Sequence, residues 1–88
     1  MTTSETLDRT EVLTTIRGFV ATELGLPGAE IGDDVPLKEL AGADSIKMLR
    51  VVAQIERRYD AEFEDEDVFK VSTLTGLTDL VFTHRGQQ

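Results

Sequence analysis

The sequence predicts an all-α fold: a small four-helix bundle with three longer helices, a short third helix and a long loop between the first two helices. Apolar residues recur at three- and four-residue spacing in three stretches, capping residues stand at the ends of those stretches, and no stretch alternates apolar and polar residues. Because 88 residues suffice for only one core, we expect a single domain over 1–88, with its core at about 8–84 and polar ends at 1–7 and 85–88.

The first helix is expected between Asp8 and Gly25. Asp8 is a candidate N-cap with Glu11 three residues later, and Leu7 and Val12 stand where a hydrophobic staple would hold the chain entering the helix. Gly25 can adopt the left-handed cap conformation that ends a helix. The apolar stripe of this helix consists of Val12, Ile16, Phe19, Val20 and Leu24.

The stretch from Gly25 to Asp44 has no helical periodicity, and we interpret it as a long ordered loop. A connection of about 20 residues is uncommon in a compact domain unless it packs on the core or has a function. Its scattered apolar residues suggest that it packs: Leu26, Ile31, Val35, Leu37 and Leu40.

The second helix is predicted over residues 45–59, with an apolar surface wider than one packing interface needs. One stripe consists of Met48, Val52, Ile55 and Tyr59, and a second beside it of Ile46, Leu49 and Ala53. Such a helix is either buried on more than half of its circumference or keeps part of this arc for a partner.

The end of the chain is predicted to hold one short helical turn and one longer helix. The acidic stretch 60–70 has Phe63, Val68 and Phe69 as apolar anchors. The last helix starts from Ser72 or Thr73 as N-cap and is weakened at Gly76 by about 1 kcal/mol relative to alanine. Its stripe is Leu74, Leu77, Leu80 and Val81.

Composition excludes several functions. The net charge of −8 repels nucleic acid, and without cysteine the chain has no disulfide, thiolate zinc site or cysteine nucleophile. No apolar run is long enough to span a bilayer, which favours a cytoplasmic protein without membrane contact.

The negative charge is unevenly spread, since residues 45–59 carry four basic and one acidic side chain. The basic ones are Lys47, Arg50, Arg57 and Arg58, which either keep the surface soluble or form a docking face.

The serine at the start of the second helix is the candidate functional residue. With Asp44 as N-cap, Ser45 is the first helical residue, and its hydroxyl lies at the positive end of the helix dipole. A phosphate ester is stabilised at such a position, although serine at a helix start is by itself usually structural.

The order of these features resembles the acyl carrier and peptidyl carrier protein family. The resemblance covers residues 10–83: a helix, a long packed loop, Gly-x-Asp-Ser-Ile leading into an apolar helix, a short acidic helix and a closing helix. It implies that Ser45 receives 4′-phosphopantetheine from coenzyme A, that Asp44 matches the aspartate before the serine, and that Ile46 matches the following residue that partners recognise. The protein would then be a carrier and not an enzyme, with no catalytic residue and no metal of its own.

The resemblance also implies partners: a phosphopantetheinyl transferase, and an adenylating ligase, acyltransferase or synthase. We expect them to dock on Lys47, Leu49, Arg50 and Arg57. Carriers of bacterial fatty acid synthesis resemble one another in an acidic second helix, so this basic one favours a polyketide or nonribosomal peptide pathway. The short chain looks like a discrete carrier, and a monomer suits a shuttle.

Three other functions are alternatives to a carrier: a hydrolase, a calcium-binding loop and an interaction module. A hydrolase built on Ser45 and His84 lacks a Gly-x-Ser-x-Gly elbow, and His84 fits better as a surface residue at the end of the last helix. A calcium loop starting at Asp60 would need glycine where Asp65 stands and glutamate where Val71 stands. An unmodified all-α interaction module, using the apolar and basic face of the second helix, remains the alternative to a carrier.

Overall fold

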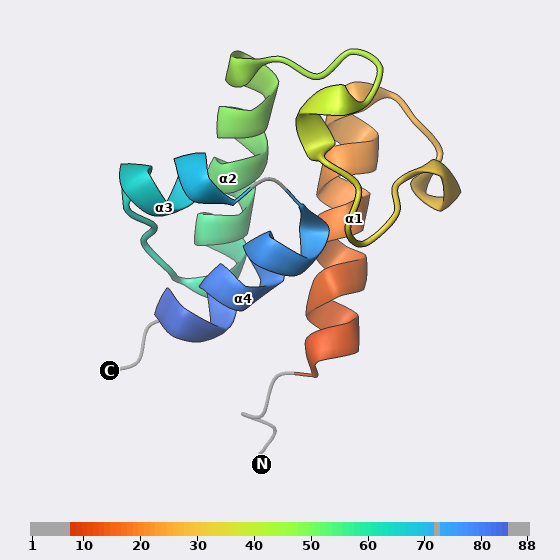
Figure 1. Ribbon diagram of the computed structural model, residues 1–88. Helices are drawn as coiled ribbons and strands as arrows, with labels where there is room; N and C mark the ends of the chain where they lie inside the picture. Colours follow the sequence, from red (N-terminus) through yellow and green to blue (C-terminus); the bar gives the residue numbers. More distant parts are fainter. Residues whose placement is uncertain (1–7, 72, 85–88) are drawn as a thin grey trace.

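The prediction of an all-α bundle is confirmed by the computed structural model, which describes residues 8–71 and 73–84 (Figure 1). Within these residues the chain forms four α-helices and two short 3-10 helices. In chain order they are α1 (Arg9–Leu24), η1 (Gly28–Glu30), η2 (Leu37–Glu39), α2 (Ser45–Tyr59), α3 (Asp65–Lys70) and α4 (Leu74–His84).

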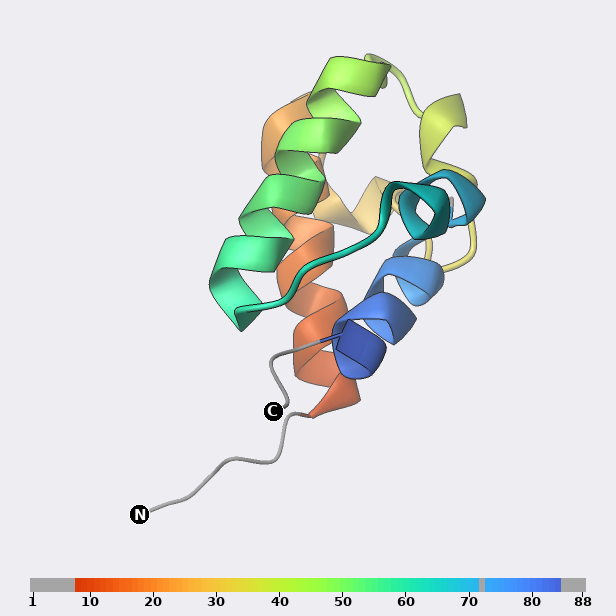
Figure 2. The same ribbon diagram turned by 90° about the vertical axis from the view of Figure 1, so that its left-hand side faces the viewer.

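The two longest helices lie side by side and run in opposite directions, so the start of α2 is at the same end of the molecule as the end of α1 (Figures 1 and 2). Helix α4 crosses obliquely against this pair, and the short α3 stands apart from α2 in the second view (Figure 2). None of the helices in the described ranges combines the length and apolar character that crossing a membrane requires.

The predicted ends of α1 and the start of α4 are confirmed. The Asp8 carboxylate accepts a hydrogen bond from Thr10 N at 2.8 Å, and Gly25 ends α1 with a φ of 70°. At the start of α4, Thr73 Oγ1 accepts from Gly76 N at 3.1 Å, which makes Thr73 the N-cap. The staple residue Leu7, the alternative cap Ser72 and the side chain of Phe69 lie outside the described part of the chain.

The core lies where α1, α2 and α4 meet. Its fully buried members are Val12, Ile16, Val20, Ile31, Val51, Ile55, Leu74, Thr78 and Val81. Thr78 is satisfied because its hydroxyl donates to Leu74 O at 2.9 Å. Val51 is fully buried although it belongs to neither stripe predicted for α2, and it joins the core cluster together with residues of α1 and α4.

The long loop packs on the core as expected, with two corrections. It contains η1 and η2, which were not predicted because a three-residue helix has no periodicity to detect. Ile31 and Leu37 are buried, whereas Val35 is 37% exposed and does not anchor the loop.

Hydrogen bonds tie the middle of this loop to two helices. Arg17 of α1 donates from Nε to Ile31 O at 3.1 Å and also pairs with the Asp33 carboxylate. Thr75 of α4 donates from its backbone N to Asp33 O at 3.1 Å, and its hydroxyl donates to the same oxygen at 3.2 Å. The loop is therefore held between α1 and α4.

Candidate functional site

Ser45 is the first residue of α2, as predicted, and Asp44 is the N-cap. The Asp44 carboxylate accepts from Lys47 N at 2.8 Å, and its carbonyl oxygen accepts from Met48 N at 3.0 Å. These two bonds fix the start of the helix and the backbone that carries Ser45.

The turn before Ser45 depends on a glycine. Gly42 has a φ of 83°, in the left-handed region that side chains disfavour. Ala43 N donates to Leu40 O at 3.1 Å and closes the turn. Ser45 and Asp44 are both exposed, so the hydroxyl at the helix start is accessible from solvent.

A cavity of about 470 Å³ opens beside Ser45. Its lining comes from η2, α2, α3 and α4 and from the residues beside them, and most of it is apolar. The residues that line it are Leu37, Lys38, Asp44, Ser45, Met48, Leu49, Val52, Val68, Val71 and Leu77.

A second, smaller cavity of about 170 Å³ continues the first along α2. Leu49, Val52 and Val68 line both cavities. At the far end of the smaller one stand Glu56 and Phe63, and the Glu56 carboxylate accepts from Phe63 N at 2.8 Å. The two cavities thus form one apolar groove that starts at Ser45.

The second apolar stripe predicted for α2 faces solvent. Ile46 is 64% exposed and Leu49 is 60% exposed. Ala53 is exposed beside them, one helical turn further on. These three residues, together with Arg50 and Arg57, form what we call the outer face of α2. Large apolar residues so exposed next to each other indicate a surface for a partner.

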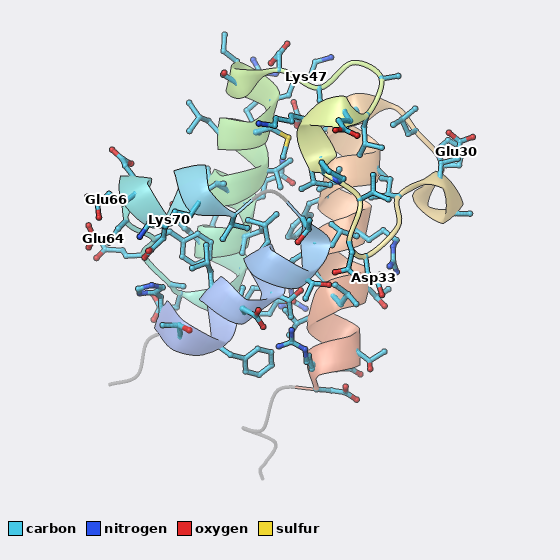
Figure 3. All side chains as sticks on the ribbon, in the orientation of Figure 1. Glu30, Asp33, Lys47, Glu64, Glu66 and Lys70 are labelled. Atoms are coloured by element: carbon cyan, nitrogen blue, oxygen red, sulfur yellow. The ribbon has the colours of Figure 1, made fainter. Side chains whose placement is uncertain are left out.

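The four basic side chains of α2 differ in their surroundings. Arg50 pairs with Glu23 of α1 at 3.3 Å, and Gln54 donates to the same carboxylate at 3.4 Å. Arg58 lies over the ring of Tyr59, 5.4 Å from its centroid. Arg57 is exposed. The ammonium of Lys47 is turned toward Gly42 (Figure 3).

His84 is the last residue of α4, as expected, and it is partly buried by contacts that the sequence does not predict. Its Nε2 lies 3.1 Å from a carboxylate oxygen of Asp67 in α3, and its ring lies 6.0 Å from that of Phe63. These contacts join the end of α4 to α3, far from Ser45 at the opposite end of α2 (Figure 1). The geometry therefore contradicts a Ser45–His84 catalytic pair.

The acidic residues of 60–70 are the ones that a calcium-binding loop would use. Among the residues that the structure describes, no three His, Cys, Asp or Glu side chains are grouped so that they could hold a metal ion.

The residues around Ser45 fit a phosphate ester with a long flexible arm. The first amides of a helix have no acceptor within it and favour a phosphate group nearby. Among the described residues only Lys47 N of this turn has an acceptor outside the helix ladder. The adjoining groove presents apolar walls that an aliphatic chain can cover.

Comparison with known proteins agrees with this geometry. Residues 14–81 match the family model described as phosphopantetheine attachment site. The chain is 28% identical over 79 residues to an acyl carrier protein of Rubrobacter xylanophilus, covering 90% of this chain and 98% of the relative. It is 31% identical over 68 residues to an acyl carrier protein of an Exiguobacterium species, covering 77% of this chain and 86% of the relative.

Solved structures show the same fold. An acyl carrier protein from Enterococcus faecalis superposes with a TM-score of 0.73 at 25% identity, covering 88% of this chain and 98% of that one. The HMG-ACPI domain from the CurA module of Lyngbya majuscula gives a TM-score of 0.76 at 20% identity, covering 94% and 85%. The chain belongs to the acyl carrier protein family, whose members are carriers that hold a covalently attached 4′-phosphopantetheine.

Proposed function

We propose that Ser45 is the attachment point of 4′-phosphopantetheine and that the protein carries acyl, aminoacyl or peptidyl groups as thioesters on that arm. The observation that carries the proposal is the exposed hydroxyl on the first residue of α2, next to the cap Asp44 and at the mouth of an apolar groove. The arm supplies a thiol, which the chain itself lacks.

The chain contributes position and not catalysis in this proposal. During loading, Ser45 Oγ would attack the pantetheine-side phosphorus of coenzyme A. The Oγ–P bond would form as the pyrophosphate bond breaks, adenosine 3′,5′-bisphosphate would leave, and the hydroxyl proton would pass to a base of the transferase. Asp44 holds the helix start through Lys47 N, so the hydroxyl stays at the exposed end of α2. The amides of the first turn then stabilise the phosphodiester charge.

The outer face of α2 is the proposed docking surface, with Lys47 at its edge. Ile46 and Leu49 offer apolar contact, and Arg57 offers an exposed positive charge. Members of this family interact with a phosphopantetheinyl transferase and with synthase or acyltransferase enzymes. For this chain we infer partners, including an adenylating ligase, with an apolar contact bordered by acidic residues, because complementary charge speeds encounter and selects partners.

A polyketide or nonribosomal peptide pathway is the proposed context, with the protein acting as a cytoplasmic monomer. The pathway is supported by the positive charge of α2, because residues 45–59 carry four basic and one acidic side chain on a chain with a net charge of −8. Carriers of bacterial fatty acid synthesis resemble one another in an acidic helix there, and this chain departs from that pattern. Synthases that dock on an acidic helix would be repelled by Arg57.

The test is an intact mass measured after incubation with coenzyme A, magnesium and a broad-specificity phosphopantetheinyl transferase. The wild type should gain one phosphopantetheine. The variant Ser45→Ala should gain none, and the matched control Ser72→Ala, which removes another of the three serines in the sequence, should gain one.

No gain by a wild type that circular dichroism shows to be folded would contradict the proposal. The unmodified interaction module would then be favoured, since Ile46 and Leu49 are exposed whether or not Ser45 is modified. Gain by Ser45→Ala would move the attachment point to another hydroxyl.

A further inference from the structure

Lys38 shares the groove with Ser45 although the two residues belong to different elements. Lys38 is the middle residue of η2, and both residues line the larger cavity. The preceding residue, Leu37, is only 2% exposed and anchors η2 in the core. Because Leu37 fixes the backbone, the Lys38 ammonium can move only as far as its own side chain allows.

The surroundings of Ser45 are short of positive charge on this side. Residues 25–44 contain five acidic side chains, including Glu39 and Asp44, and Lys38 is their only basic one. Asp44 lines the same cavity as Ser45. A phosphodiester on Ser45 would add another negative charge beside that carboxylate, and the partial charge of the helix end must offset both.

The Lys38 ammonium is available for this role. Within the described residues it has no carboxylate within 4.0 Å, unlike Arg50, which is paired with Glu23 at 3.3 Å. Lys47 is closer in sequence, and its ammonium lies 3.7 Å from where a Cβ on Gly42 would stand, but Lys47 does not line the cavity that Ser45 lines. Lys38 is thus the basic residue that lines the cavity together with Ser45.

We propose that Lys38 is a positioning residue that pairs with the phosphodiester of the arm and draws the arm from Ser45 across the mouth of the groove toward η2. The proposal rests on the proposed function, because it requires the arm to be on Ser45. It assigns a role to a residue outside the Asp44-Ser45-Ile46 motif and outside the docking surface.

The test compares the apo and phosphopantetheinylated forms of the wild type, Lys38→Gln and Lys38→Arg. Lys70→Gln is the matched control, since Lys70 is an exposed lysine of α3 that does not line the groove, and its loss changes the net charge equally. Intact mass confirms loading of each variant, and circular dichroism of the apo form confirms its fold. Two readouts follow that do not depend on any partner enzyme.

The first readout is the ³¹P chemical shift of the phosphodiester, measured at low and high salt. The wild type should show a salt-dependent shift, because salt screens an exposed ion pair. Lys38→Gln should lose that dependence, Lys38→Arg should retain it, and Lys70→Gln should behave as the wild type.

The second readout is the effect of loading on the folding equilibrium constant, from urea unfolding of apo and loaded forms. Relative to the wild type, the ratio of loaded to apo constants should fall about two- to fivefold in Lys38→Gln, as expected for an exposed ion pair. It should not change in Lys70→Gln.

Equal ³¹P shifts and equal loading ratios in Lys38→Gln and Lys70→Gln would overturn the proposal. So would a Lys47→Gln variant that alone shows both effects, because Lys47 would then be the cation that pairs with the phosphodiester. Failure of the wild type to take up the arm would instead contradict the proposed function, so the two failures are distinguishable by mass.

Discussion

Gly76 lies directly against Val71: a Cβ atom built on Gly76 would stand 2.6 Å from Val71 Cγ1. The first turn of α4 therefore approaches the end of α3 closely enough that no side chain fits between them. Val71 lines the groove beside Ser45. Gly76, which lowers the helix propensity of α4, thus allows Val71 to take its place in the wall of the groove.

We expect Gly76→Ala to destabilise the protein even though alanine favours helix. The overlap with Val71 should cost about 1–3 kcal/mol, more than the roughly 1 kcal/mol gained in helix propensity. Gly18→Ala in α1 is the matched control, because nothing lies within 4 Å of its Cβ position, and it should be stabilising by about 0.5–1 kcal/mol. Urea unfolding measures both, and equal stabilisation by the two variants would refute the close contact.

Asp44→Ala should lower the free energy of unfolding by about 0.5–2 kcal/mol, because Lys47 N loses its side-chain acceptor. Asp44→Asn should retain most of the stability, since an amide oxygen can also cap. Asp8→Ala at the start of α1 is a reference for a cap far from Ser45. A stability of Asp44→Ala equal to that of the wild type would show that the cap does not hold α2.

Arg17→Met should loosen the long loop without unfolding the bundle. The substitution removes the bond to Ile31 O and the pair with Asp33, while the two bonds from Thr75 remain. We expect faster hydrogen exchange at loop amides such as that of Ile31, and little change in the centre of α2. Unchanged exchange at Ile31 would mean that Thr75 alone holds the loop.

Arg57→Glu and Arg50→Glu should both slow transfer to the carrier by its partner enzyme at low salt, because both reverse charge on the outer face of α2. They should differ in stability. Arg50→Glu places a carboxylate beside Glu23, whose side chain is 15% exposed, and should be destabilising by about 0.5–1 kcal/mol. Arg57→Glu should leave the melting temperature unchanged. A transfer rate that neither variant alters would contradict the proposed docking surface.

Much of the fold is predictable from the sequence because the signals are local. Asp8, Gly25 and Asp44 mark helix ends through bonds within a few residues of themselves, so their positions follow from the order of residues. The start of α2, and with it the position of Ser45, was predictable for the same reason.

Other features could not be predicted from the sequence because they depend on residues far apart in the chain. Arg50 meets Glu23 across 27 positions, and His84 meets Asp67 across 17. The groove requires η2, α2, α3 and α4 to assemble around it, and Lys38 gains its place beside Ser45 only then. Charge counted along the sequence cannot show which of these groups face each other.

The two sides of the groove differ in the length of the helices that carry them. Ser45 begins a helix of 15 residues, whereas Val68 belongs to a helix of six. Six residues are too few for a helix to persist without tertiary support. We therefore expect the groove to change its width by displacement of α3 while the attachment point stays still. Acyl groups of different lengths could then occupy the groove while the start of α2, where partner enzymes would bind, keeps its geometry.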